Sequence, residues 1–85
     1  MKLLFSKRFI KSLKKQPKKI QNETKLRLQL FLKDPFHILL KRHALKGKLQ
    51  NFESINVSGD IRIIFYCVSD TKIELLDIGS HSFLY

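Results

Sequence analysis

The hydrophobic pattern changes period midway along this 85-residue chain, and this change restricts the fold more than any other feature. In the second half, the runs FESINV at 52–57 and IRIIFYCV at 61–68 are rich in β-branched and aromatic residues. The tripeptide SGD between them is typical of a hairpin turn, and SDTK at 69–72 marks another turn before IELLDI at 73–78. We therefore expect three antiparallel strands in succession.

Side chains along the middle strand, residues 61–68, must alternate between the two faces of the sheet. One face then carries Ile61, Ile63, Phe65 and Cys67, and the other carries Arg62, Ile64, Tyr66 and Val68. We expect helices to cover one face of the sheet. The uncovered face must be partly polar, and Arg62 can point there.

The first half indicates a short strand, MKLLF at 1–5, followed by a helix, KRFIKSLKKQ at 7–16. Ser6 is a suitable N-cap for this helix, which carries one apolar stripe. Pro17 either ends the helix or lies in the first turn of the next one, where its missing N–H costs nothing.

The segment KKIQNETKLRLQLFL at 18–32 fits two kinds of structure, because its leucines alternate as they would in a strand. Its fifteen residues contain no turn signal, and Glu23 and Arg27 form a favourable i,i+4 pair, so we expect a second helix. The sequence KDP at 33–35 should end this helix, since the residue before a proline is disfavoured in the α region.

Helices followed by antiparallel strands predict an α+β fold, in one domain that spans residues 1–85. A short N-terminal strand and two helices packed on one face would accompany a small, mainly antiparallel sheet. Hydrophobic residues make up 44% of the chain and include seven Phe, which is sufficient for the one modest core that a chain of this length can build.

Cysteine content and hydropathy bear on the compartment. Cys67 is the single cysteine, which rules out an internal disulfide and fits a reducing compartment. The opening MKLLFSKRF has too short an apolar run for a secretory signal, and no stretch approaches the ~20 apolar residues of a membrane span. We expect a soluble, cytoplasmic protein with no membrane partner.

The charge is large and unevenly distributed, with a net value of +10. Residues 1–48 hold 15 Lys or Arg and two acids, whereas residues 49–85 hold two basic residues and five acids. A basic half of this strength attracts polyanions, so nucleic acid is the first candidate partner and an acidic protein segment the second. A solvated lysine-rich surface that only aids solubility is the alternative.

Cleavage of RNA without a metal needs a base for the 2′-OH, an acid for the leaving 5′-oxygen, and cations for the charge that develops on phosphorus. Histidine suits either proton-transfer role, arginine grips phosphate oxygens with two N–H groups, and tyrosine can stack on a base. The candidates in this chain are His43, Arg62, His81 and Tyr85.

Each candidate also has a structural explanation. His37, in DPFHILL, is most simply a packed or surface loop residue, and His43 and His81 taken alone are weak signals. Asp60 is more often a hairpin-turn residue than a catalytic one. The chain has no CxxC, no HxxxH, no glycine-rich phosphate loop and no GxSxG motif, so we expect neither a metal nor a cofactor.

Three motifs in order, HALKGKL, GDIRIIFY and LLDIGSHSFLY, resemble the RelE/ParE superfamily of toxins from bacterial type II toxin–antitoxin pairs. The RelE/StbE and YafQ-like mRNA interferases are the most similar branches. The similarity spans nearly the whole chain, including the opening segment and the KDPF turn. It implies a small RelE-like α+β fold that cuts mRNA, often in the ribosomal A site, and an antitoxin that wraps the toxin.

The resemblance also implies roles for individual residues. His43 matches the histidine of the H-x-L-x-G motif in the YafQ-like branch, and Asp60 resembles the aspartate at the hairpin turn of that branch. Arg62 matches an arginine that contacts the scissile phosphate in the RelE branch. His81 takes the place of the histidine in G-[ST]-H, and Tyr85 falls at the terminal aromatic position.

One position departs from the family pattern. The strand before the hairpin usually carries a basic residue or histidine, and here that position is Asn56. Asparagine can orient a substrate, but it cannot exchange a proton at neutral pH. Either His43 and His81 share the acid–base work, or the protein is slow or inactive.

The leading hypothesis is a metal-independent endoribonuclease toxin that acts on ribosome-bound mRNA and is held by an acidic antitoxin. Gly79 would let the chain turn so that His81 and Tyr85 face the open side of the sheet. Backbone phosphates would be held by Lys41, Arg42, Lys46 and Lys48. The alternatives are a non-catalytic, ParE-like module that docks on a protein target, and a plain nucleic-acid binder.

Overall fold

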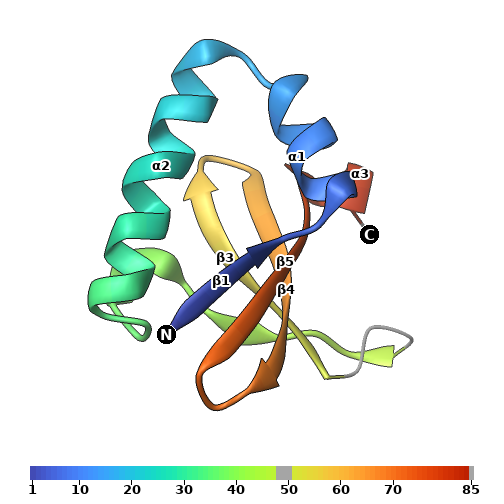
Figure 1. The fold of residues 1–85 in the computed structure, drawn as a ribbon. Coiled ribbons are helices and arrows are strands. Elements are labelled where there is room, and N and C mark those ends of the chain that lie inside the picture. Colours follow the sequence, from blue (N-terminus) through green and yellow to red (C-terminus); the bar gives the residue numbers. More distant parts are fainter. Residues whose placement is uncertain (48–50, 85) are drawn as a thin grey trace.

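The computed structural model describes residues 1–47 and 51–84. Five strands, two long helices, a 3₁₀ turn and a short C-terminal helix follow one another along the chain (Figure 1). Their bounds are β1 Lys2–Phe5, α1 Lys7–Lys14, α2 Lys18–Lys33, η1 Ile38–Leu40, β2 His43–Ala44, β3 Phe52–Ser58, β4 Ile61–Ser69, β5 Lys72–Ser80 and α3 His81–Leu84. The predicted α+β class is confirmed.

The five strands form one sheet in the order β1-β5-β4-β3-β2. The pairs β2–β3, β3–β4 and β4–β5 are antiparallel, whereas β1 runs parallel to β5 at one edge. The sheet is therefore mainly antiparallel, as predicted, and its first strand lies beside its last.

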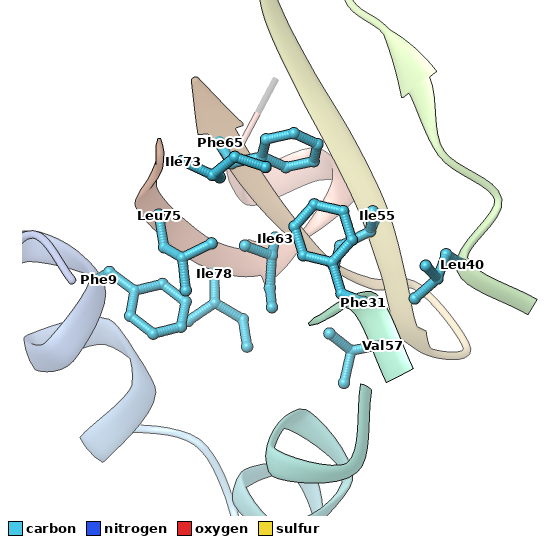
Figure 2. Packing of buried hydrophobic residues seen from close by; sticks show 10 residues of the cluster. All are labelled: Phe9, Phe31, Leu40, Ile55, Val57, Ile63, Phe65, Ile73, Leu75 and Ile78. Carbon is cyan, nitrogen blue, oxygen red and sulfur yellow. The ribbon is translucent and has the colours of Figure 1, made fainter. Parts of the chain in front are cut away.

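Both long helices pack on the same face of the sheet. Figure 2 shows Phe9 from α1 beside Leu75 and Ile78, and Phe31 from α2 beside Phe65. The rings of Phe31 and Phe65 lie 5.1 Å apart between centroids. Full burial of side chains of this size stabilises the fold by about 1.5–3 kcal/mol each. The opposite face of β3 and β4 is left uncovered by these helices, as the strand alternation predicted.

The helix ends follow the local signals in the sequence. The side-chain oxygen of Ser6 accepts a hydrogen bond from the backbone N–H of Phe9 at 3.0 Å, as expected of an N-cap. Pro17 is the N-cap residue of α2, and Asp34, the residue before Pro35, leaves the helical region with φ −146°. The segment with alternating leucines is helical, as its length predicted.

The C-terminal end differs from the sequence-based expectation. Gly79 does not turn the chain: it is buried within β5, opposite Arg62 on β4, and the strand continues to Ser80. Among the glycines of the described residues, positive φ values occur at Gly47 and Gly59. The short helix α3 instead follows β5, and no pattern in the sequence predicted it. Tyr85 lies outside the described residues.

The described chain also contains two very short elements. The two-residue strand β2 and the turn η1 were not predicted, because elements this short show no periodicity. Within the described residues, no helix has the length and the apolar character needed to cross a membrane.

Candidate functional site

A polar row crosses the uncovered face near the end of the sheet. The strand register places Asn56 on β3 and Gly79 on β5 on either side of Arg62 on β4. A glycine within a strand often marks a place where another group approaches closely, and here it leaves one flank of Arg62 without a neighbouring side chain. The row therefore places the guanidinium group between an amide side chain and a glycine.

Among the buried side-chain nitrogen and oxygen atoms of the described residues, one on Arg62 lacks a hydrogen-bond partner. Its Nε atom is buried and has no partner among the described residues. A buried donor left unpaired costs about 1–3 kcal/mol, so its persistence calls for an explanation. The ion pairs of the described residues use Arg8, Arg27 and Arg42 instead. An arginine in this state is suited to bind an anion such as phosphate.

Two more of the candidate residues meet at the same end of the sheet. Asp60 lies in the tight turn between β3 and β4, and His81 follows directly after β5. The carboxylate oxygen Oδ2 of Asp60 accepts a hydrogen bond from the backbone N–H of His81 at 3.3 Å. Both residues are exposed. The fold thus brings Asp60, Arg62 and His81 together, although they are far apart in the sequence.

His43 lies on the edge strand β2, on the same uncovered face. Its Nδ1 atom is 3.0 Å from the carbonyl oxygen of Lys41, and its Nε2 atom is 3.3 Å from the hydroxyl of the fully buried Ser54. Because a carbonyl can only accept, Nδ1 carries the proton, and in the neutral ring Nε2 accepts from Ser54. The imidazole is therefore held in one orientation.

His43 and Arg62 are separated by two strand spacings and by two residues along the strands. Standard strand geometry puts their Cα atoms about 12 Å apart. This separation can be spanned by a phosphate group and two long side chains. The candidate site is thus an extended face, with His43 at one side and His81 at the other.

Arg42 is placed differently from the other predicted cations. Its Nε and Nη2 atoms donate to the two carboxylate oxygens of Glu53 at 2.8 and 3.1 Å. Its guanidinium also lies over three aromatic rings, those of Phe31, Phe36 and Phe65. The hydrogen bonds between Arg42 and Glu53 raise the pKa of Arg42 and lower the pKa of Glu53. The guanidinium group of Arg42 is therefore already paired with Glu53 within the fold.

The remaining predicted cations lie near β2. Lys41 and Lys46 are exposed at its two ends, and Lys48 lies outside the described residues. Within the described part of the chain, no group of three or more His, Cys, Asp or Glu side chains is placed to hold a metal ion.

The family to which the chain belongs can be stated from its sequence. A family described as the bacterial toxin of type II toxin–antitoxin systems, YafQ, matches residues 1–85. The chain belongs to the YafQ toxin family. The resemblance to RelE-like toxins is thereby confirmed, and the YafQ branch is the one that matches. A comparison with curated protein sequences gave no match.

Solved structures of toxins share this fold. YafQ from E. coli strain BL21(DE3) matches 98% of this chain and 96% of its own with a TM-score of 0.82, at 21% sequence identity. A copper-bound mutant toxin from Helicobacter pylori matches 100% and 99% with a TM-score of 0.72, at 32% identity. YafQ in the E. coli DinJ–YafQ toxin–antitoxin complex matches 98% and 94% with a TM-score of 0.79, at 21% identity.

Two features of the uncovered face of this YafQ-family protein were not predicted from the sequence. Ser54, which contacts His43, could have been assigned to the uncovered face from the alternation in FESINV. Phe52 and Tyr66 form an edge-to-face aromatic pair on that face, with ring centroids 5.5 Å apart. To predict either contact, one must know the strand register, which residue types alone do not determine.

Proposed function

We propose that this chain is a ribonuclease toxin of a type II toxin–antitoxin pair, and that it cleaves mRNA on the ribosome in the cytoplasm. The observation that carries the proposal is Arg62, whose buried Nε atom lacks a partner among the described residues on the uncovered face of the sheet. Membership of the YafQ toxin family supports it. The reaction would need no metal, because side chains can supply each of its three chemical requirements.

The chemistry would be attack of the 2′-oxygen on the adjacent phosphorus. One of His43 and His81 takes the 2′-OH proton, and the other protonates the 5′-oxygen as the P–O5′ bond breaks. Arg62 stabilises the additional negative charge on the phosphorane. The products are a 2′,3′-cyclic phosphate and a free 5′-OH.

The remaining predicted residues would hold the RNA in place. Lys41 and Lys46 are exposed, precede and follow β2 and are available to backbone phosphates, and Lys48 would extend this set. Tyr85 would stack on a base next to the cleaved bond. Asp60 holds the backbone of His81 and would contribute indirectly through that contact.

A cognate acidic antitoxin is the second part of the proposal. The net charge of +10 favours an acidic partner, and YafQ from E. coli has been crystallised with the antitoxin DinJ. A groove of about 430 Å³ between β1, α1 and α2 also offers apolar side chains with a lysine rim. Its lining includes Leu3, Phe5, Leu13, Leu28, Leu32, Lys18 and Lys25.

The decisive experiment maps the ends of mRNA by primer extension after expression of the toxin, and repeats it in a purified translation reaction. Cleavage with a 2′,3′-cyclic phosphate end is expected. Replacing His81 by alanine should lower the cleavage rate on the order of 10²-fold if His81 is a general acid or base. The matched control is His37→Ala, since His37 contacts the backbone N–H of Leu39 and lies outside the proposed site.

Two results would overturn the proposal. Cleavage that is unchanged in a folded His81→Ala variant removes His81 from the chemistry. Growth inhibition that persists in both Arg62→Ala and His81→Ala, without any new mRNA ends, indicates a toxin that docks on a protein target instead of cutting RNA.

A further inference from the structure

We propose that Asn56 is a positioning residue for His81, and that it acts through the turn between β3 and β4. The inference rests on the proposed ribonuclease function for its effect on catalysis, but the physical coupling between Asn56 and His81 can be measured without RNA. The amide of Asn56 cannot exchange a proton at neutral pH, so its role must differ from proton transfer.

The first step is the contact between Asn56 and the turn. The side-chain Nδ2 atom of Asn56 donates a hydrogen bond to the carbonyl oxygen of Gly59 at 3.0 Å. Gly59 has φ +53°, a left-handed conformation that glycine adopts without strain. The Asn56 amide thus ties the strand to the turn residue immediately before Asp60.

The second step is the bulge that precedes the turn. The register shifts between Asn56 and Ser58, so Val57 faces no partner residue across the strand pair. The carbonyl oxygen of Val57 instead accepts a hydrogen bond from Nε of Arg27, on α2, at 3.0 Å. The helix therefore holds the turn from the covered side of the sheet, and Asn56 holds it from the open side.

The third step connects the turn to His81. The carboxylate of Asp60 accepts from the backbone N–H of His81 at 3.3 Å, and Ile61, the next residue, pairs with Ser80. The position of His81 relative to Arg62 therefore depends on the conformation of the turn. A shift of about 1 Å in a catalytic group can cost up to 10²-fold in rate, so this dependence matters for catalysis.

The chemistry of the amide makes the proposal specific. Asparagine donates to the Gly59 carbonyl, whereas an aspartate of the same shape has no proton to donate at neutral pH and would place its negative charge against the carbonyl oxygen. Asn56→Asp should therefore release the turn while keeping the size of the side chain. Asn22→Asp is the matched control, because Asn22 is exposed on α2 and lines the groove between β1, α1 and α2.

The first measurement is the backbone amide resonance of His81 in a ¹H–¹⁵N NMR spectrum of the free protein. Asp60→Ala should shift this resonance, because it removes the acceptor. Asn56→Asp should shift it in the same direction, and Asn22→Asp should not. A His81 resonance that Asn56→Asp leaves in place overturns the proposal, whether or not the protein cleaves RNA.

The second measurement is a double-mutant cycle on RNA cleavage. Asn56→Asp should lower kcat on the order of 10-fold with KM little changed, and should have no further effect in the His81→Ala background. Effects that multiply, or a change confined to KM, would mean that Asn56 contacts the RNA directly and would overturn the proposal. If Asn56→Asp does not fold, Asn56→Ala serves in both measurements, since it removes the donor without adding a charge.

If the wild-type protein does not cleave RNA, the proposed function fails, and the NMR measurement alone decides whether Asn56 positions His81.

Discussion

Arg42 and Arg62 lie on opposite faces of the same sheet and differ in their hydrogen bonds and in the side chains beside them. The side chain of Arg42 is 13% exposed, forms two hydrogen bonds to Glu53 and lies over three phenylalanine rings. Arg62 has a buried Nε atom without a partner among the described residues, next to a glycine. A satisfied arginine is a cross-link within the fold, whereas an unsatisfied one retains its capacity to bind an anion.

The largest expected effect concerns Arg62. Arg62→Ala should lower the rate of mRNA cleavage on the order of 10²- to 10³-fold, as is usual when a donor that stabilises transition-state charge is removed. The free energy of unfolding should not fall, because the buried Nε makes no hydrogen bond to lose and its removal relieves an unpaired donor. Cleavage assays and urea denaturation measure the two quantities. A loss of stability with normal cleavage would reverse the roles of the two arginines.

Arg42→Ala should show the opposite pattern. The change leaves the Glu53 carboxylate partly buried without its partner, so the free energy of unfolding should fall by about 2 kcal/mol. Cleavage per folded molecule should remain close to that of the wild type. Replacing both partners, as Arg42→Met with Glu53→Leu, should recover part of the stability. A cleavage defect in folded Arg42→Ala would assign this residue to RNA binding after all.

Acid should weaken the contact between Arg42 and Glu53. The hydrogen bond from Arg42 lowers the pKa of Glu53 below its ordinary value of 4.5. As the pH falls below that value, the unfolded state takes up the proton first, and the stabilisation is lost as the pH falls through the folded-state pKa. Urea denaturation between pH 6 and 3 should show this loss. Glu53→Gln should flatten that part of the profile, and an unchanged slope would contradict the assignment.

The smallest expected effect concerns Cys67, whose thiol lies 3.3 Å from Glu53. Burial, followed by the Glu53 carboxylate, raises the pKa of Cys67 above its ordinary value. The thiol should therefore react with iodoacetamide at pH 8 more slowly than free cysteine does. Glu53→Gln should increase the rate by a small factor. Rapid alkylation of the wild-type protein would show that the structure around Cys67 and Glu53 opens more readily than the Arg42 contacts suggest.

The sequence was sufficient to predict the elements but not their contacts. Alternation in residues 61–68 correctly separated the core side chains from Arg62, and Ser6 and Pro35 correctly marked helix ends. These features depend on a few neighbouring residues. The two-residue strand β2 was missed for the same reason, because it is too short to show a period.

The environments of the site residues depend on tertiary structure. Arg42 and Arg62 belong to the same residue type in a basic chain, and only the fold places Glu53 beside one and Gly79 beside the other. Gly79 was expected to turn the chain because glycine often does so, yet here it lies within β5. Such distinctions require the strand register, which residue types alone do not determine.

The position of β5 between β1 and β4 has a consequence for protein synthesis. β5 is the last of the five described strands to be synthesised, and β1, the first of them, has β5 as its neighbour in the sheet. The first strand must therefore wait for most of the chain before it can pair, and such long-range pairing is intrinsically slow. The row that contains Arg62 is likewise incomplete until Gly79 has been added, so the candidate site cannot assemble before all five described strands have been synthesised.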